Sequence, residues 1–115
     1  MLIKKCLFII FTFLTFCVSA QNIDSLKNEL NGLSVDTSRA KIYNEIAQAY
    51  TFSNLDSADK YIQEAFDIEE KLNYKRGLQE TWFIAALIDI YRNELDQAIK
   101  KYKIALSVSE QINDK

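Results

Sequence analysis

The charged side chains of this chain, which could serve as acids or bases, are carboxylates, lysines and a few arginines. Aspartate and glutamate together number 16, lysine and arginine number 14, and histidine is absent. The usual general base is therefore missing, and so is the commonest ligand of transition metals. The only glycines, Gly32 and Gly77, stand alone, which excludes a glycine-rich phosphate loop.

The carboxylates are spaced as expected for helix surfaces. Several stand one helical turn before a lysine, and such pairs stabilise a solvated helix by ~0.2 to 0.5 kcal/mol each. Catalysis by carboxylates instead requires perturbed groups gathered in a cleft. We therefore expect no enzyme activity, no cofactor and no bound metal. The pairs are Asp56 with Lys60, Asp67 with Lys71, and Asp96 with Lys100.

The N-terminal segment has the pattern of a secretory signal peptide. Two lysines are followed by an apolar run of thirteen residues, Cys6 to Val18, and small residues precede Gln21. This pattern predicts cleavage after Ala20 and export to the periplasm or the cell exterior. The run is shorter than the ~20 residues that span a membrane, so an uncleaved anchor is the less favoured alternative.

The chain that would remain after cleavage, residues 21–115, is one small acidic domain. It carries 12 basic and 16 acidic residues, and both cysteines, Cys6 and Cys17, would be lost with the signal peptide. Its negative net charge offers no attraction for nucleic acid. Without a thiol or a disulfide, the domain must be held together by packing alone.

Two stretches in the second half of the chain align without a gap. The segment that starts at Leu55 and the one that starts at Leu95 are offset by 40 residues. A period between ~20 and ~50 residues indicates stacked supersecondary units. Eight residues recur unchanged: Leu55, Asp56, Ala58, Lys60, Ala65, Glu70, Asn73 and Lys75 return as Leu95, Asp96, Ala98, Lys100, Ala105, Glu110, Asn113 and Lys115.

Hydrophobic spacing predicts helices through most of the chain, which contains no proline. Asp36 or Thr37 should cap the second helix, Ser53 should open the third, and Asn93 should open the last. The expected helices cover residues 22–33, a second segment from about 37, and then 55–73, 76–92 and 95–113.

The apolar positions of these helices predict a core. The stretch from Trp82 to Ile88 is apolar throughout, which predicts a helix buried on more than one side. The other side chains expected to be buried are Tyr43, Ile46, Ala47 and Tyr50 in the second helix and Ala58, Ile62, Ala65, Phe66 and Leu72 in the third.

These residues resemble the tetratricopeptide repeats, whose units are helical hairpins joined through small side chains. The resemblance covers residues 37–115. It departs from the family pattern at the turn glycine, replaced by Ser53 and Asn93, and at Asp89, where the family mostly has tyrosine. The matching residues are Tyr43, Ile46, Ala47, Tyr50, Ala58, Ile62 and Ala65 in the first unit and Trp82, Ala85, Ala86, Ala98, Tyr102 and Ala105 in the second.

The resemblance implies an all-α fold, a right-handed α-solenoid of helix-turn-helix hairpins. An N-terminal amphipathic helix and turn over 21–35 would follow the signal peptide of 1–20, and the two repeats would occupy 36–75 and 76–115. An unrelated amphipathic helical bundle is the alternative. The groove that the resemblance implies would be lined by Lys41, Asn44, Gln48 and Thr51 from the first unit and by Glu80, Phe83, Leu87, Ile90 and Tyr91 from the second.

Such a groove implies a protein or peptide partner. For the apolar groove residues, an ordinary place in the core is the competing interpretation. The last helix presents Tyr102, Leu106 and Ile112 with no later element to cover them, so we expect this side to associate with a second copy or with another protein, the alternative being that the chain is the opening segment of a longer protein. The sequence thus predicts an exported, non-enzymatic interaction module. The alternative is the extracytoplasmic input region of a bacterial sensor kinase or transcriptional regulator, which a downstream output domain would distinguish.

Overall fold

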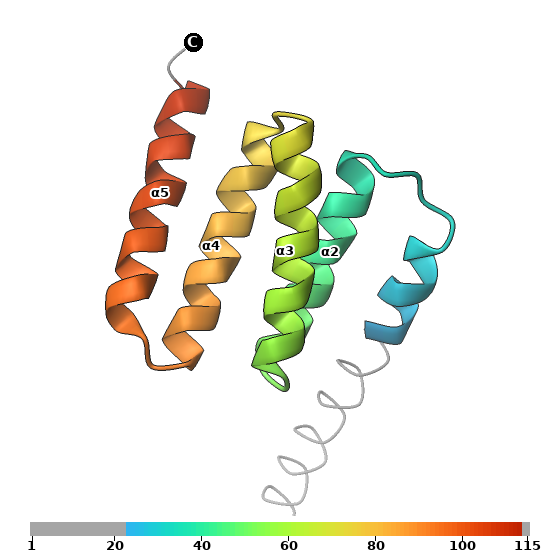
Figure 1. The fold of residues 1–115 in the computed structure, drawn as a ribbon, viewed down its shortest axis with the longest axis horizontal. Helices are drawn as coiled ribbons and strands as arrows, with labels where there is room; N and C mark the ends of the chain where they lie inside the picture. Colours follow the sequence, from blue (N-terminus) through green and yellow to red (C-terminus); the bar gives the residue numbers. More distant parts are fainter. Residues whose placement is uncertain (1–22, 114–115) are drawn as a thin grey trace, which may run out of the picture.

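A computed structural model describes residues 23–113 of the chain, and these residues are helical apart from short turns (Figure 1). The segment expected to be a signal peptide and both cysteines lie outside the described residues. The expectation of an all-α fold is confirmed. Within the described range, no helix is long and apolar enough to span a membrane. The helices are a short N-terminal helix over residues 23–30, followed by α2 (Thr37–Tyr50), α3 (Leu55–Lys71), α4 (Lys75–Tyr91) and α5 (Leu95–Asn113).

Consecutive helices from α2 onward run in opposite directions and pack side by side (Figure 1). α2 packs on α3, α3 on α4 and α4 on α5, and α2 also contacts α4. Because the turns within the pairs α2–α3 and α4–α5 are short, each pair is a helical hairpin. The second hairpin rests on the first, which places α4 between the first hairpin and α5.

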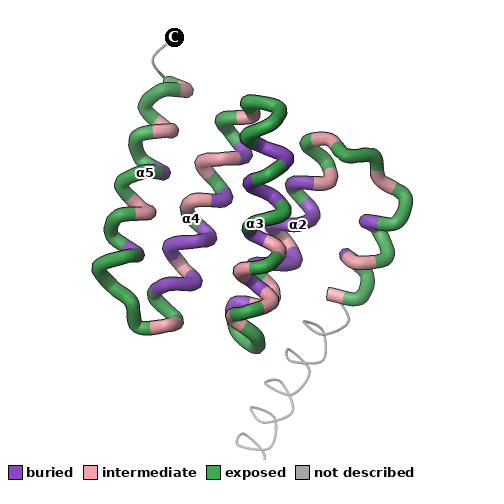
Figure 2. The backbone as a smooth tube through the Cα atoms, viewed as in Figure 1, coloured by how far each residue is buried: buried purple, intermediate pink, exposed green. Residues whose placement is uncertain are grey.

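Alanines lie where the helices approach most closely. Ala47, Ala58, Ala65 and Ala86 are completely buried, and a small side chain lets neighbouring backbones come close at normal packing density. Figure 2 shows that buried positions follow the facing sides of α2, α3 and α4, whereas α5 is exposed along most of its length. The strongly apolar α4 has seven buried residues, against six each in α2 and α3, but Phe83, within the stretch expected to be buried, is 54% exposed.

Most of the predicted core residues are buried. Tyr50 is half-buried, and the expectation for Leu72 is wrong, because 47% of its surface is exposed. Leu72 is the C-cap of α3, so it lies beyond the last turn that α4 covers. Ile68 and Glu69 are the buried residues at that end of α3.

Asparagines end both α3 and α4. Asn73 and Asn93 have φ angles of 51° and 65°, in the left-handed region that asparagine tolerates better than most residues. The next amide in each turn donates to a carbonyl five residues back, over 2.8 Å in both cases, which is the Schellman arrangement. Asn93 therefore ends α4, and the expectation that it opens α5 is wrong.

Two side chains cap helices at their N-termini. Asp36 Oδ1 accepts from the Ser38 amide over 2.9 Å, as expected for the cap of α2. α3 is capped by Asn54, whose Oδ1 accepts from the Ser57 amide over 3.1 Å. The expected start at Ser53 is one residue too early to reach that free amide.

The N-terminal helix covers one end of the stack. Leu26 and Leu30 are each 8% exposed and belong to a core cluster with Tyr43 of α2 and Ile68 of α3. Arg39 holds the turn after this helix in place. Its Nη1 donates to the backbone carbonyls of Leu30 and Leu33 over 3.1 Å each. The surface of α2 that faces away from α4 is thus already occupied.

Arginine, not lysine, pairs with the acidic residues at the start of α3. Arg92 forms ion pairs with Asp56, at 3.0 Å, and with Asp59, and so connects the end of α4 to α3. The pairs predicted from spacing, such as Asp56 with Lys60, are not among the ion pairs of residues 23–113. Exposed pairs of this kind contribute little to stability, about 0 to 1 kcal/mol.

Candidate functional site

The residues of the expected groove lie on α2 and α4 but differ in exposure. Asn44 and Thr51 are only 1% and 2% exposed, so their side chains meet other parts of the protein and not the solvent. The remaining members reach the surface: Lys41 and Gln48 on α2 and Glu80, Phe83, Ile90 and Tyr91 on α4 are exposed, and Leu87 is half-buried.

Asn44 belongs to a buried hydrogen-bonded cluster beneath the groove. Its Nδ2 donates to Thr81 Oγ1 over 2.8 Å. Thr81 Oγ1 also lies 2.5 Å from Glu69 Oε1 and 2.9 Å from the carbonyl oxygen of Gly77. The cluster takes one side chain from each of α2, α3 and α4. It therefore joins the two hairpins through polar contacts at the centre of the core.

Glu69 is the member of this cluster that sequence reasoning missed. Burial raises the pKa of Glu69 to about 7, against the effect of the Thr81 hydrogen bond, which lowers it. Gly77 leaves the room that this carboxyl occupies, since a Cβ at Gly77 would overlap both Glu69 Oε2 and the ring of Tyr74. The sequence does indicate its burial by position. Ile62, Ala65 and Glu69 follow one another at intervals of three and four, so Glu69 lies on the buried face of α3.

A polar cleft of about 250 Å³ opens over this cluster, between α2 and the start of α4. Two of the predicted groove residues, Lys41 and Glu80, stand on its walls. The cleft thus combines two cationic and two carboxylate side chains, which suits a polar or charged group of a ligand. The lining residues are Thr37, Ser38, Lys41, Asn44, Glu69, Tyr74, Arg76, Gly77 and Glu80.

Farther along α4, the groove is apolar. Phe83, Leu87 and Ile90 recur at spacings of four and three, so they share one face of the helix. Phe83 is 54% and Ile90 38% exposed. At the end of α4, Tyr91 meets the edge of Phe52 with the ring centroids 5.3 Å apart, beside a hollow of about 560 Å³.

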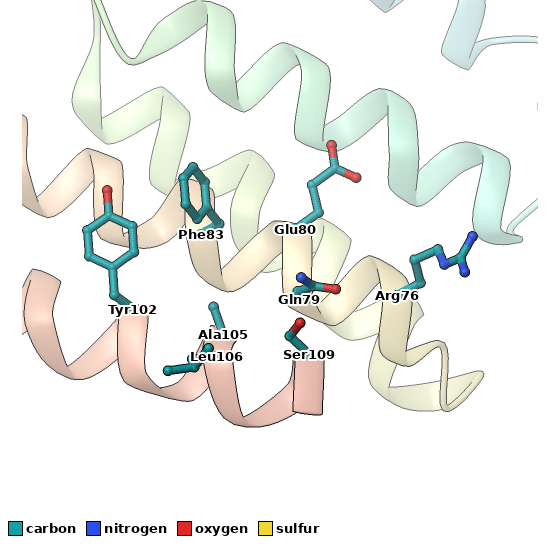
Figure 3. A pocket seen from close by; sticks show the side chains of 8 residues that line it. All are labelled: Arg76, Gln79, Glu80, Phe83, Tyr102, Ala105, Leu106 and Ser109. Carbon is teal, nitrogen blue, oxygen red and sulfur yellow. The ribbon is translucent and has the colours of Figure 1, made fainter. Parts of the chain in front are cut away.

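A third hollow, of about 550 Å³, lies between α4 and α5. The ring of Phe83 meets that of Tyr102 edge-on across it, with centroids 5.2 Å apart. Figure 3 shows the side chains that line it: Arg76, Gln79, Glu80 and Phe83 from α4, and Tyr102, Ala105, Leu106 and Ser109 from α5. Its walls are mainly apolar, so it suits an apolar side chain of a partner.

The charged groups in the interior join helices. Asp89, 3% exposed, pairs with Lys101, whose Nζ lies 2.8 Å from Asp89 Oδ2 without the angles of a hydrogen bond. This ion pair connects α4 to α5 at the position where the repeat family has tyrosine. Across residues 23–113, no three potential metal ligands gather in one place.

The chain matches no known protein-family model, no curated protein and no solved structure. The geometry of these surfaces and the resemblance to the tetratricopeptide repeats are therefore what indicate a function.

Proposed function

We propose that this protein is an exported, non-enzymatic interaction module that binds a peptide segment of another protein along α2 and α4. We further propose that its hairpins form a right-handed solenoid of the tetratricopeptide type. The antiparallel hairpins, the buried alanines between them and the central position of α4 support this arrangement.

The observation that carries the proposal is the exposed apolar row on α4. Phe83, Ile90 and Tyr91 keep between 38% and 54% of their surface exposed, although α4 has more buried residues than any other described helix. Exposed apolar side chains that gather on one face mark an interaction surface more often than scattered ones do. Two hollows of about 550 and 560 Å³ adjoin this row.

The composition of the groove suggests the character of the peptide. The polar cleft at the start of α4 presents Lys41 and Arg76 beside Glu80, and the apolar row continues from Phe83 toward Tyr91. A peptide with apolar residues at helical spacing, followed by polar or charged residues, complements both halves. The affinity would come mostly from the apolar anchors.

A library of random peptides, selected against protein purified from cells that express the full chain, tests the proposal. We expect enriched peptides to share apolar positions, and we expect Tyr91→Ala to weaken their binding by about tenfold, as loss of an aromatic anchor does. Titration of fluorescent peptides measures the dissociation constant.

The control variant is Val35→Ala, because Val35 is 70% exposed, lies in the turn before α2 and lines neither the cleft nor the two hollows. It should leave binding unchanged. If no peptides are enriched, or if Val35→Ala weakens binding as much as Tyr91→Ala, the groove is not the binding surface.

A further inference from the structure

The two hairpins of this protein differ in how far their second helix is covered. Ile62 and Phe66 of α3 are 2% and 8% exposed because α4 packs over them. The residues 40 positions later on α5 are Tyr102, which is half-buried, and Leu106, which is 60% exposed. The apolar surface of α3 is thus covered by the next helix, whereas the equivalent apolar surface of α5 is exposed.

The exposed surface of α5 has the spacing of a coiled-coil seam. Leu95, Ile99, Tyr102 and Leu106 follow one another at intervals of four, three and four residues, which is the alternation of heptad positions a and d. Leu95 and Ile99 are 56% and 52% exposed. This seam, defined by the four residues above, is not covered by another helix within residues 23–113.

The two flanks of the seam are different. On one side Ala98 and Ala105 are buried against α4. On the other side Asp96, Lys103 and Glu110 are exposed and alternate in charge along the helix. A partner helix would meet this charged flank, and like charges there would oppose binding.

We propose that a second copy of this chain covers the seam, with the two α5 helices antiparallel about a two-fold axis. Within each hairpin and between the hairpins of one copy, neighbouring helices are already antiparallel (Figure 1). The two α5 helices of the dimer would thus pack as antiparallel neighbours, as α3 and α4 do within one copy. The proposal does not depend on peptide binding along α2 and α4.

The charges select one register for this pair. When Leu95 faces Leu106 of the second copy and Ile99 faces its Tyr102, every seam residue meets an apolar one. The exposed flank then places Asp96 beside Lys103 of the second copy, twice by symmetry, so that opposite charges meet. A shift by one heptad would bring Lys103 against its own equivalent and would pair Ile99 with Ser109.

A closed pair is favoured over an open stack of copies. In head-to-tail stacking, the seam of one copy would have to pack against the α2 end of the next copy. The N-terminal helix already covers that end through Leu26 and Leu30. An isologous contact uses the seam on both copies and leaves no further surface of this kind.

The test is a double-mutant cycle on the two charges, with the protein purified from cells that express the full chain. Sedimentation measures the dimer dissociation constant for wild type, Asp96→Lys, Lys103→Glu and the double variant. We expect wild type to dimerise, each single variant to bind about tenfold more weakly, and the double variant to recover most of that loss.

Lys100→Glu is the matched control, since Lys100 is exposed on α5 outside the seam and its change reverses the same charge as Lys103→Glu. Circular dichroism establishes that each variant is folded. Leu106→Glu, at an exposed position, should give a folded monomer. A monomeric wild type, a tenfold loss with Lys100→Glu, or losses in the single variants that add in the double variant would overturn the proposal.

Discussion

Asn44 of α2 and Thr81 of α4 face each other across 37 residues of sequence and lie within 2.8 and 3.1 Å through their side-chain atoms. Thr81 has one hydroxyl proton but three acceptors within reach, on Asn44, Glu69 and Gly77. Only one of them can receive it at a time. The protonation of Glu69 therefore decides how this buried cluster shares its hydrogens.

Thr81→Val should destabilise the protein by about 1 to 3 kcal/mol. Valine keeps the shape but removes the hydroxyl, which leaves Asn44 and Glu69 buried without their shared partner. Urea unfolding followed by circular dichroism measures the loss. Thr81→Ser keeps the hydroxyl and should retain more stability than Thr81→Val; the opposite order would mean that the cluster contributes nothing beyond packing.

The stability should fall as the pH rises from about 4.5 to about 7. The pKa of Glu69 is raised from 4.5 to about 7 in the folded state, so between these values the folded chain binds more protons than the unfolded one. The contribution is largest below pH 4.5 and is lost above pH 7. Glu69→Gln removes this dependence.

The measurement is the free energy of unfolding of both proteins at several pH values. The stability of Glu69→Gln relative to wild type should rise by up to about 3 kcal/mol between pH 4.5 and 7. Glu70→Gln, an exposed neighbour on α3, controls for the change of net charge. A constant difference between Glu69→Gln and wild type would contradict the proposed titration.

Gly77→Ala should be strongly destabilising, by about 1 to 3 kcal/mol or more. The new methyl would overlap Glu69 Oε2 and the Tyr74 ring, whereas a methyl at Gly32 meets no atom within 4 Å. Gly32→Ala is therefore the control and should have little effect. Thermal melting of the two variants compares them directly, and equal melting temperatures would show that the room at Gly77 is not needed.

Lys101→Met should lower stability by about 1 to 3 kcal/mol because it leaves the Asp89 carboxylate buried without its cation. Adding Asp89→Asn should recover part of the loss, since a neutral amide is less costly to bury. Chemical unfolding of the single and double variants gives both values. No recovery in the double variant would mean that Lys101 acts through its methylene chain and not through its charge.

The helices and the small residues at their contacts could be predicted, because the spacing of apolar residues and the size of each side chain can be read from the sequence. The buried alanines such as Ala58 and Ala65 illustrate this. Glu69 was not predicted, because its place in the buried spacing after Ile62 and Ala65 is visible but the room that Gly77 leaves for its carboxyl on another helix is not. The resemblance to the tetratricopeptide repeats predicts Asn44 and Thr51 in the groove, but their burial depends on how α4 rests on α2.

The turns show a similar limit. Ser53 and Asn93 both have side chains suited to a helix start, and sequence alone does not reveal which residue adopts the left-handed conformation. That choice is made by the backbone hydrogen bond that closes the preceding helix, as in the turn from Asn93 to Glu94. Local propensity therefore located these turns to within a residue without assigning their roles.

The sparse burial of α5 has a consequence for the order in which the protein opens. α5 contributes only Ala98 and Ala105 to the buried residues, whereas α2, α3 and α4 each contribute several. Elements with few buried contacts open locally at a lower free energy than the rest of a domain. In the monomer, the amide hydrogens of α5 should therefore exchange with solvent before those of α2 to α4, through an opening that leaves the first hairpin folded.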